Sequence, residues 1–117
     1  MKLKYKFWFE KDGEPILGRG GADILKAIEE SGSIMGAAQS LGMSYRFVWN
    51  YLEKMESRIG KVVEKERGGK SGGGTTLTPL GKALLDQYFS VEEQLEAMAE
   101  KVEKMLNEDV DVEADGS

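Results

Sequence analysis

The stretch IMGAAQSLGMSYRFVWNYL, residues 34–52, decides the fold, because it predicts two short helices joined by a tight turn. Ser33 is placed to cap the first helix, and Gly42 can adopt the positive φ that ends it. Ser44 is placed to cap the second helix, which we expect to span residues 44–59.

Small and apolar residues lie where two closely crossing helices would need them. Ala38 lies four residues before the glycine of the turn, and the other apolar positions are Ala37, Leu41, Met43, Val48 and Tyr51. A helix-turn-helix of this kind inserts its second helix into the major groove of DNA. An ordinary corner between two core helices has a similar pattern, so this segment alone leaves both interpretations open.

The flanking sequence predicts small strands, one further helix on the N-terminal side and a long helix on the C-terminal side. Lysine alternates with apolar residues before a turn at Lys11–Glu14, which indicates a β-hairpin. Pro79 after Thr78 marks a helix start. The expected strands are 2–10, 15–18, 62–67 and 75–77, with a glycine-rich segment at 68–74, and the expected helices outside the central pair are 22–31 and 79–106.

This order of elements predicts a mainly α fold with small β-hairpins, of the α+β class. Three helices followed by a hairpin with a glycine-rich tip describe a winged helix-turn-helix, here with an additional N-terminal hairpin. The expected division is a winged helix-turn-helix domain at 1–78, a dimerisation helix at 79–106 and an acidic flexible tail at 107–117.

Apolar residues recur in the last helix at alternating steps of four and three, which is the spacing of a coiled coil. Such a seam favours pairing with the same helix of a second chain over packing back onto its own domain. The expected dimer interface is Leu84, Tyr88, Val91, Leu95, Met98, Val102 and Met105.

The formal net charge of −5 argues at first against a nucleic-acid partner, but the charge is unevenly distributed. Residues 1–88 carry 14 basic and 11 acidic side chains, and residues 89–117 carry 2 basic and 10 acidic ones. The central region, 40–82, has a local charge of +4, from 8 basic and 4 acidic residues. A basic surface is therefore compatible with an acidic chain.

The residue inventory excludes several classes of chemistry. Histidine and cysteine are both absent, which removes disulfides, thiol nucleophiles, Ser-His-Asp triads and zinc fingers. Lys70-Ser71 lacks the first glycine of a P-loop and the helix after it, and the acidic residues near the C-terminus lack the glycine and final glutamate of an EF-hand. We expect no enzyme activity, cofactor or metal, and a cytoplasmic location without membrane contact.

Candidate DNA contacts lie on the second helix of the pair and on the expected wing, residues 67–75. Arginine suits guanine, asparagine suits adenine, and serine at a helix N-terminus suits phosphate. Trp49 is expected to pack rather than to contact bases, and Glu53 and Glu56 to face away from DNA. The candidates are Ser33, Ser44, Tyr45, Arg46, Asn50, Lys54, Arg67, Lys70, Ser71 and Thr75.

Residues 20–85 resemble the N-terminal DNA-binding domain of the ModE family of molybdate-responsive regulators, which are related to LysR-type winged helices. The resemblance rests on SGSI at 31–34, Ala37-Ala38, GMSYR at 42–46 with Trp49, the wing RGGKSGGG at 67–74, and LTPLG at 77–81. It implies a dimeric transcriptional regulator whose recognition helix and wing bind a palindromic operator. Full-length members add an oxyanion-binding domain that has no counterpart here, so a separate oxyanion-sensing protein is an expected partner.

The sequence therefore predicts a homodimeric, sequence-specific regulator that binds double-stranded operator DNA. The alternative is a protein-interaction module that uses the winged-helix core and acidic C-terminus without specific DNA binding.

Overall fold

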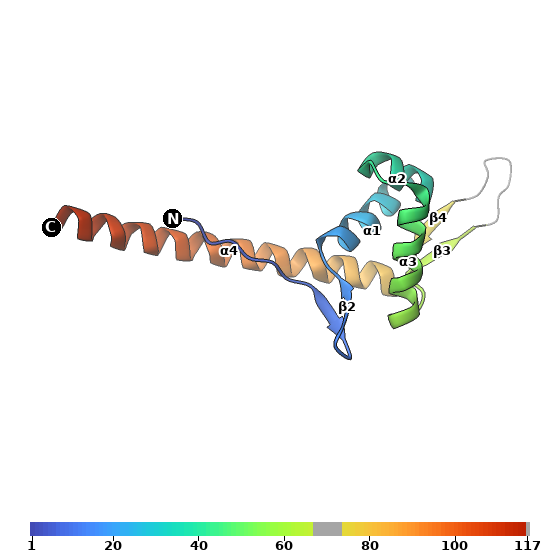
Figure 1. Cartoon of the computed structure of the whole chain (residues 1–117), viewed down its shortest axis with the longest axis horizontal. Helices are drawn as coiled ribbons and strands as arrows, with labels where there is room; N and C mark the ends of the chain where they lie inside the picture. Colours follow the sequence, from blue (N-terminus) through green and yellow to red (C-terminus); the bar gives the residue numbers. More distant parts are fainter. Residues whose placement is uncertain (67–73, 117) are drawn as a thin grey trace. The chain divides into compact units, whose positions relative to one another are not determined.

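The computed structural model describes residues 1–66 and 74–116, with side chains up to residue 108. Within them the chain is mainly helical with two small antiparallel hairpins, as the sequence predicted (Figure 1). The elements are β1 (Phe9–Lys11), β2 (Glu14–Leu17), α1 (Arg19–Ser31), α2 (Ile34–Leu41), α3 (Tyr45–Ile59), β3 (Val63–Lys65), β4 (Thr75–Leu77) and α4 (Pro79–Gly116).

The chain forms two compact units. One unit is Phe7–Tyr88, which contains the three-helix core and both hairpins. The other combines Met1–Lys6 with Phe89–Ser117. In the described part of the chain, no helix is long and apolar enough to cross a membrane.

The core of the first unit forms where α1, α2 and α3 pack together. Ile24, Leu25 and Ile28 of α1 and Val48 of α3 are fully buried. Removing one such side chain from water contributes about 1.5–3 kcal/mol. Ala37 and Ala38 of α2 are also buried, so two small residues of this helix lie in the core.

Left-handed glycines end α1 and α2. Gly32 and Gly42 have φ angles of 76° and 67°, and the amide of Gly42 bonds back to the carbonyls of Ala38 and Gln39. In the N-terminal hairpin, Asp12 and Gly13 have φ angles of 52° and 79°, as a two-residue type I′ turn requires. The structure thus confirms the predicted turn at Lys11–Glu14 and the predicted positive φ of Gly42.

The second hairpin is joined to the helices at its base. The Thr75 amide donates to the Gly32 carbonyl at 2.8 Å, which ties β4 to the end of α1. Thr78 caps α4, since its hydroxyl oxygen accepts from the Gly81 amide at 3.1 Å. A Cβ on Gly81 would collide with the Val62 carbonyl oxygen, so a glycine is needed where α4 begins.

The first predicted strand, residues 2–10, is wrong over most of its length. Strand β1 comprises only Phe9–Lys11, because its partner β2 has four residues and offers nothing further to pair with. Helix α1 begins three residues earlier than predicted, at Arg19, and α4 continues past residue 106 to Gly116.

In the second unit, the N-terminal residues lie against α4. The Leu3 amide donates to Glu103 at 2.8 Å, and the Met1 ammonium donates to Asn107 at 2.6 Å. Loss of hydration and the carboxylates of Glu96 and Glu92 raise the pKa of Tyr5. The lysine-rich N-terminus therefore pairs with an acidic helix face instead of with a strand.

Candidate nucleic-acid interface

Helix α3 presents one face to the core and the opposite face to solvent. Val48, Leu52 and Met55 are buried at steps of four and three. At 100° per residue, Arg46 and Asn50 fall on the other side of the helix, and both are exposed. The structure thus leaves free the two predicted side chains best suited to reading bases.

A hollow of about 420 Å³ lies on this exposed face. The rings of Tyr45 and Trp49 stack with centroids 6.2 Å apart and an interplanar angle of 22°. The hollow is lined by Tyr45, Arg46, Trp49, Asn50 and Glu53. Aromatic surface, a cation, an amide and a carboxylate therefore line one hollow over about two and a half turns of helix.

Trp49 is half-buried, and Lys65 of β3 covers its ring. The Lys65 Nζ lies 3.1 Å from the ring centroid, which is a cation–π contact between β3 and α3. Figure 1 shows β3 and β4 side by side near α3. Trp49 therefore both packs, as predicted, and lines the hollow.

The two predicted serine contacts act as helix caps. The Ser33 hydroxyl oxygen accepts from the Gly36 amide at 2.8 Å, and the Ser44 hydroxyl oxygen accepts from the Phe47 amide at 3.1 Å. Capping uses a lone pair of each oxygen and leaves the hydroxyl proton available. Ser44 can therefore cap α3 and donate to a phosphate at the same time.

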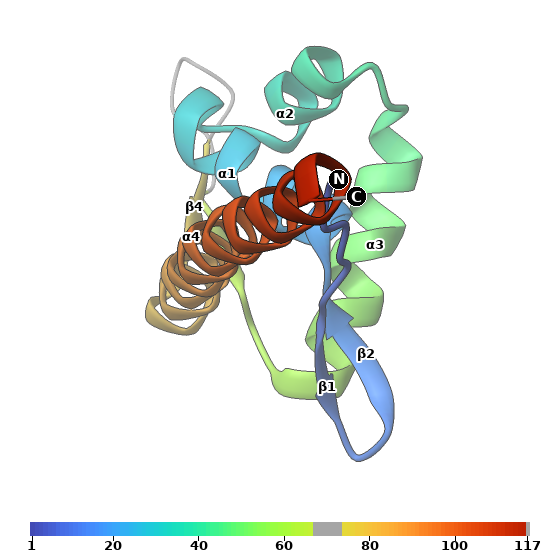
Figure 2. The ribbon, with the colours of Figure 1, turned by 90° about the vertical axis from the view of Figure 1, so that its left-hand side faces the viewer.

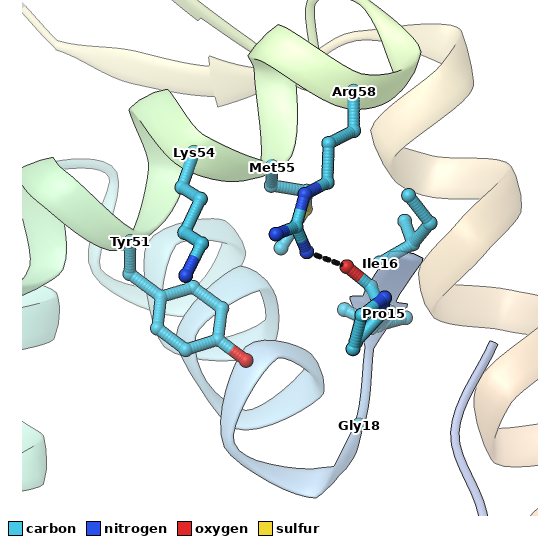
Figure 3. Close-up of a pocket in the computed structure, with 8 residues that line it drawn as sticks. Pro15, Ile16, Gly18, Tyr51, Lys54, Met55 and Arg58 are labelled. Carbon is cyan, nitrogen blue, oxygen red and sulfur yellow. Dashed lines mark hydrogen bonds between the residues drawn. The ribbon is translucent and has the colours of Figure 1, made fainter. Parts of the chain in front are cut away.

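Lys54 lies on a different side of α3, at a pocket that residues of β2 also line (Figure 3). Figure 2 shows β2 beside the C-terminal half of α3. Arg58, one turn further on, donates to the Pro15 carbonyl and lies 3.1 Å from the Glu14 carboxylate. Arg58 therefore holds the N-terminal hairpin against α3. Of the predicted contacts on α3, Lys54 is the one that does not line the hollow.

Tyr51 lines the same pocket and packs on the start of α1. Burial raises the pKa of the phenol, and a hydrogen bond with the Gly21 backbone opposes that shift. A Cβ at Gly21 would lie 3.1 Å from the Tyr51 ring and hydroxyl. This inward side of α3 is therefore structural.

The two glutamates of α3 differ in position. Glu56 accepts from the amides of Val62 and Val63 at 2.9 and 3.2 Å, so its carboxylate is held at the start of β3. Glu53 instead lines the hollow together with Arg46 and Asn50, on the face that carries the candidate base contacts.

The predicted wing contacts are only partly described. Thr75 is 6% exposed and its side chain is buried in the hairpin, so it does not reach the surface. Arg67, Lys70 and Ser71 lie outside the described residues. Sequence reasoning also missed Phe47, which is 52% exposed on α3, and Lys65, because only the fold brings β3 to Trp49.

The predicted seam on α4 is exposed along its C-terminal half. Met98 and Met105 are 60% and 58% exposed, and Val91, Leu95 and Val102 are partly exposed. Tyr88 is instead covered within the chain, stacked on Phe7 with ring centroids 4.6 Å apart. Leu84 is partly exposed.

The family model described as "Bacterial regulatory helix-turn-helix protein, lysR family" matches residues 22–82. The molybdenum-pterin-binding protein MopB of Rhodobacter capsulatus is 36% identical over 94 residues, which cover 80% of this chain and 35% of MopB. The transcriptional regulator ModE of Haemophilus influenzae is 40% identical over 70 residues, 59% of this chain and 28% of that protein. The chain thus spans about a third of the length of these relatives.

Two solved structures show the same fold at low sequence identity. Full-length CbnR complexed with its target DNA matches 70% of this chain and 27% of that chain, with a TM-score of 0.55 and 19% identity. The Staphylococcus aureus MepR–DNA complex matches 78% of this chain and 77% of the MepR chain, with a TM-score of 0.53 and 17% identity.

Proposed function

Because the chain belongs to the lysR family of bacterial regulatory helix-turn-helix proteins, we propose that it is a sequence-specific, DNA-binding transcriptional regulator of ModE-like type. Helix α3 enters the major groove and the glycine-rich wing contacts the backbone beside it. This is a binding function rather than an enzymatic one. We expect the protein to act in the cytoplasm, where its DNA target lies.

The exposed face of α3 is the observation that carries this proposal. Arg46 offers two parallel donors for guanine O6 and N7, and Asn50 offers a donor and an acceptor for adenine N6 and N7. Both side chains line the hollow and are free of the core. The capped N-terminus of α3 beside them supplies a partial positive charge for phosphate.

We also propose that α4 pairs with α4 of a second copy. The apolar stripe Val91, Leu95, Met98, Val102 and Met105 keeps the coiled-coil spacing, and its two methionines are largely exposed. The N-terminal segment bonds Glu103 and Asn107, which lie roughly 120° and 160° around the helix from the centre of this stripe. The chain's own N-terminus therefore does not compete with a second copy for the stripe.

A two-fold dimer presents two recognition helices and predicts a palindromic operator. Half-sites one helical turn apart would be about 34 Å from centre to centre, or a multiple of that distance. Symmetry also doubles the number of base contacts, which compensates for the small positive excess of the DNA-binding region.

The test is selection of bound duplexes from a random-sequence DNA pool, followed by titration at several salt concentrations. We expect enrichment of an inverted repeat, and an affinity that falls linearly with the logarithm of the salt concentration. If no sequence is enriched and no DNA is retained at low salt, the protein-interaction alternative replaces this proposal.

A further inference from the structure

The carboxylate of Glu53 occupies an unexpected place for a helix that faces DNA. It lies in the hollow with Arg46, Trp49 and Asn50, and its side chain is exposed. Within residues 1–66 and 74–108, Glu53 has neither a hydrogen bond nor an ion pair. The charge of Glu53 therefore makes no stabilising contact within the described residues.

Glu56, on the next turn, shows what a structural carboxylate looks like in this helix. It accepts two hydrogen bonds, from the backbone amides of Val62 and Val63, and it points away from the hollow. Glu53 has no such contacts and faces the side where phosphates would repel it. Such a charge weakens general DNA affinity, and it gains a favourable contact where a base supplies a hydrogen-bond donor to it.

Resting on the DNA-binding function proposed above, we propose that Glu53 accepts a hydrogen bond from the N4 amino group of a cytosine in the major groove and thereby selects that base. Glutamate is suited to this role because a carboxylate only accepts hydrogen bonds. Guanine O6 and thymine O4 are acceptors and repel it, and adenine places its N7 acceptor beside its N6 donor.

The geometry of α3 makes this contact compatible with those of its neighbours. Residues three apart are separated by about 4.5 Å along a helix axis, and successive bases of one strand by about 3.4 Å. Asn50 and Glu53 can therefore address adjacent or nearly adjacent base pairs. The cation–π contact from Lys65 fixes the indole of Trp49, which forms an apolar wall of the same hollow.

The experiment compares the intact protein with Glu53→Ala and Glu53→Gln by selection from a random-sequence DNA pool. We expect one position in each half-site of the wild-type motif to be cytosine. Glu53→Ala should lose the preference at that position alone, and Glu53→Gln should shift it towards adenine, which glutamine can bind with a donor and an acceptor.

Titration on matched duplexes gives the size of the effect. Replacing the selected C·G pair by T·A should weaken the wild type by about 5- to 100-fold and Glu53→Ala by less than about twofold. Glu53→Ala should also bind unrelated DNA more tightly, because a repulsive charge has been removed. The matched control is Glu93→Ala, which removes the same charge from an exposed position of α4 and should retain the wild-type motif.

Two failures are distinguishable in this design. In the first, the wild type enriches a motif and both Glu53→Ala and Glu53→Gln enrich the same motif. That result would overturn the role of Glu53 but not the proposed function. A wild type that enriches no motif at all overturns sequence-specific binding itself, and the role of Glu53 with it.

Discussion

Helices α3 and α4 each expose side chains that their own unit does not bury, but of opposite chemistry. The open face of α3 carries a cation, an amide and a carboxylate around two stacked rings. The open stripe of α4 carries methionines, leucine and valines. Polar groups with fixed geometry suit a surface lined with hydrogen-bond donors and acceptors, whereas a continuous apolar stripe suits another apolar stripe.

This difference separates recognition from assembly along one chain. A change on the face of α3 should alter which DNA is bound, and a change on the stripe of α4 should alter how many copies bind it. Single substitutions on either helix test that separation.

Met98→Glu should disrupt the proposed dimer. An unpaired carboxylate buried between two helices costs about 3–5 kcal/mol, which is a loss of at least about 100-fold in dimer affinity. Because Met98 is 60% exposed, the single chain should keep its fold, as circular dichroism can verify. Sedimentation equilibrium measures the mass in solution.

The matched control is Ala97→Glu, which adds the same charge at an exposed neighbouring position off the stripe. It should remain dimeric. A dimeric Met98→Glu protein would show that the stripe of α4 is not the interface.

Arg46→Ala should weaken binding to the selected operator by about 1–3 kcal/mol and relax the preference at one base pair. Lys104→Ala removes one positive charge from an exposed position of α4 and should preserve both affinity and preference. Equal behaviour of the two variants on matched and mismatched duplexes would remove Arg46 from the set of base-reading residues.

Substitutions of Ser44 test whether one hydroxyl both caps α3 and binds a DNA phosphate. Ser44→Ala should lower the free energy of unfolding by about 0.5–2 kcal/mol, because the Phe47 amide loses its cap. Ser44→Asp restores the cap but places a negative charge next to phosphate, so it should recover stability and not DNA affinity. Recovery of both in Ser44→Asp would mean that Ser44 only caps the helix.

Tyr51→Phe should have the smallest effect, about 0.5–1.5 kcal/mol on unfolding, because only the hydrogen bond with Gly21 is lost. The pKa of this phenol is raised above 10.0 in the fold, so the folded state holds the proton more tightly than the unfolded chain. The resulting stabilisation is present below pH 10 and is lost as the pH rises through the raised pKa. Denaturation at increasing pH should show a shallower alkaline loss for the phenylalanine variant.

Local signals in the sequence predicted most of the fold. Ser33, Ser44, Gly42 and the Thr78-Pro79 pair mark helix ends through hydrogen bonds with neighbouring residues, so their reading does not depend on distant contacts. The alternating lysines at the N-terminus failed as a strand signal because the partner strand is short and α4 offers them carboxylates.

Only part of the candidate site could be predicted from the sequence. Arg46 and Asn50 follow from helical periodicity once α3 is recognised. The cover of Trp49 by Lys65 does not, because it joins positions 16 residues apart through the arrangement of β3 against α3. Helical periodicity also puts Glu53 on the side of α3 that carries Arg46 and Asn50, and the structure shows all three lining one hollow.

The contact between Gly21 and Tyr51 constrains how this protein can vary. The space that a side chain at position 21 would fill is occupied by the Tyr51 phenol and by a methyl group of Leu17, at 3.1 and 2.8 Å from its Cβ. The three positions therefore share one volume, and substitutions there should be strongly non-additive. In homologous sequences we expect a larger residue at position 21 to be accompanied by smaller ones at positions 17 and 51, as a covarying set that ties the start of α1 to β2 and to the inward side of α3.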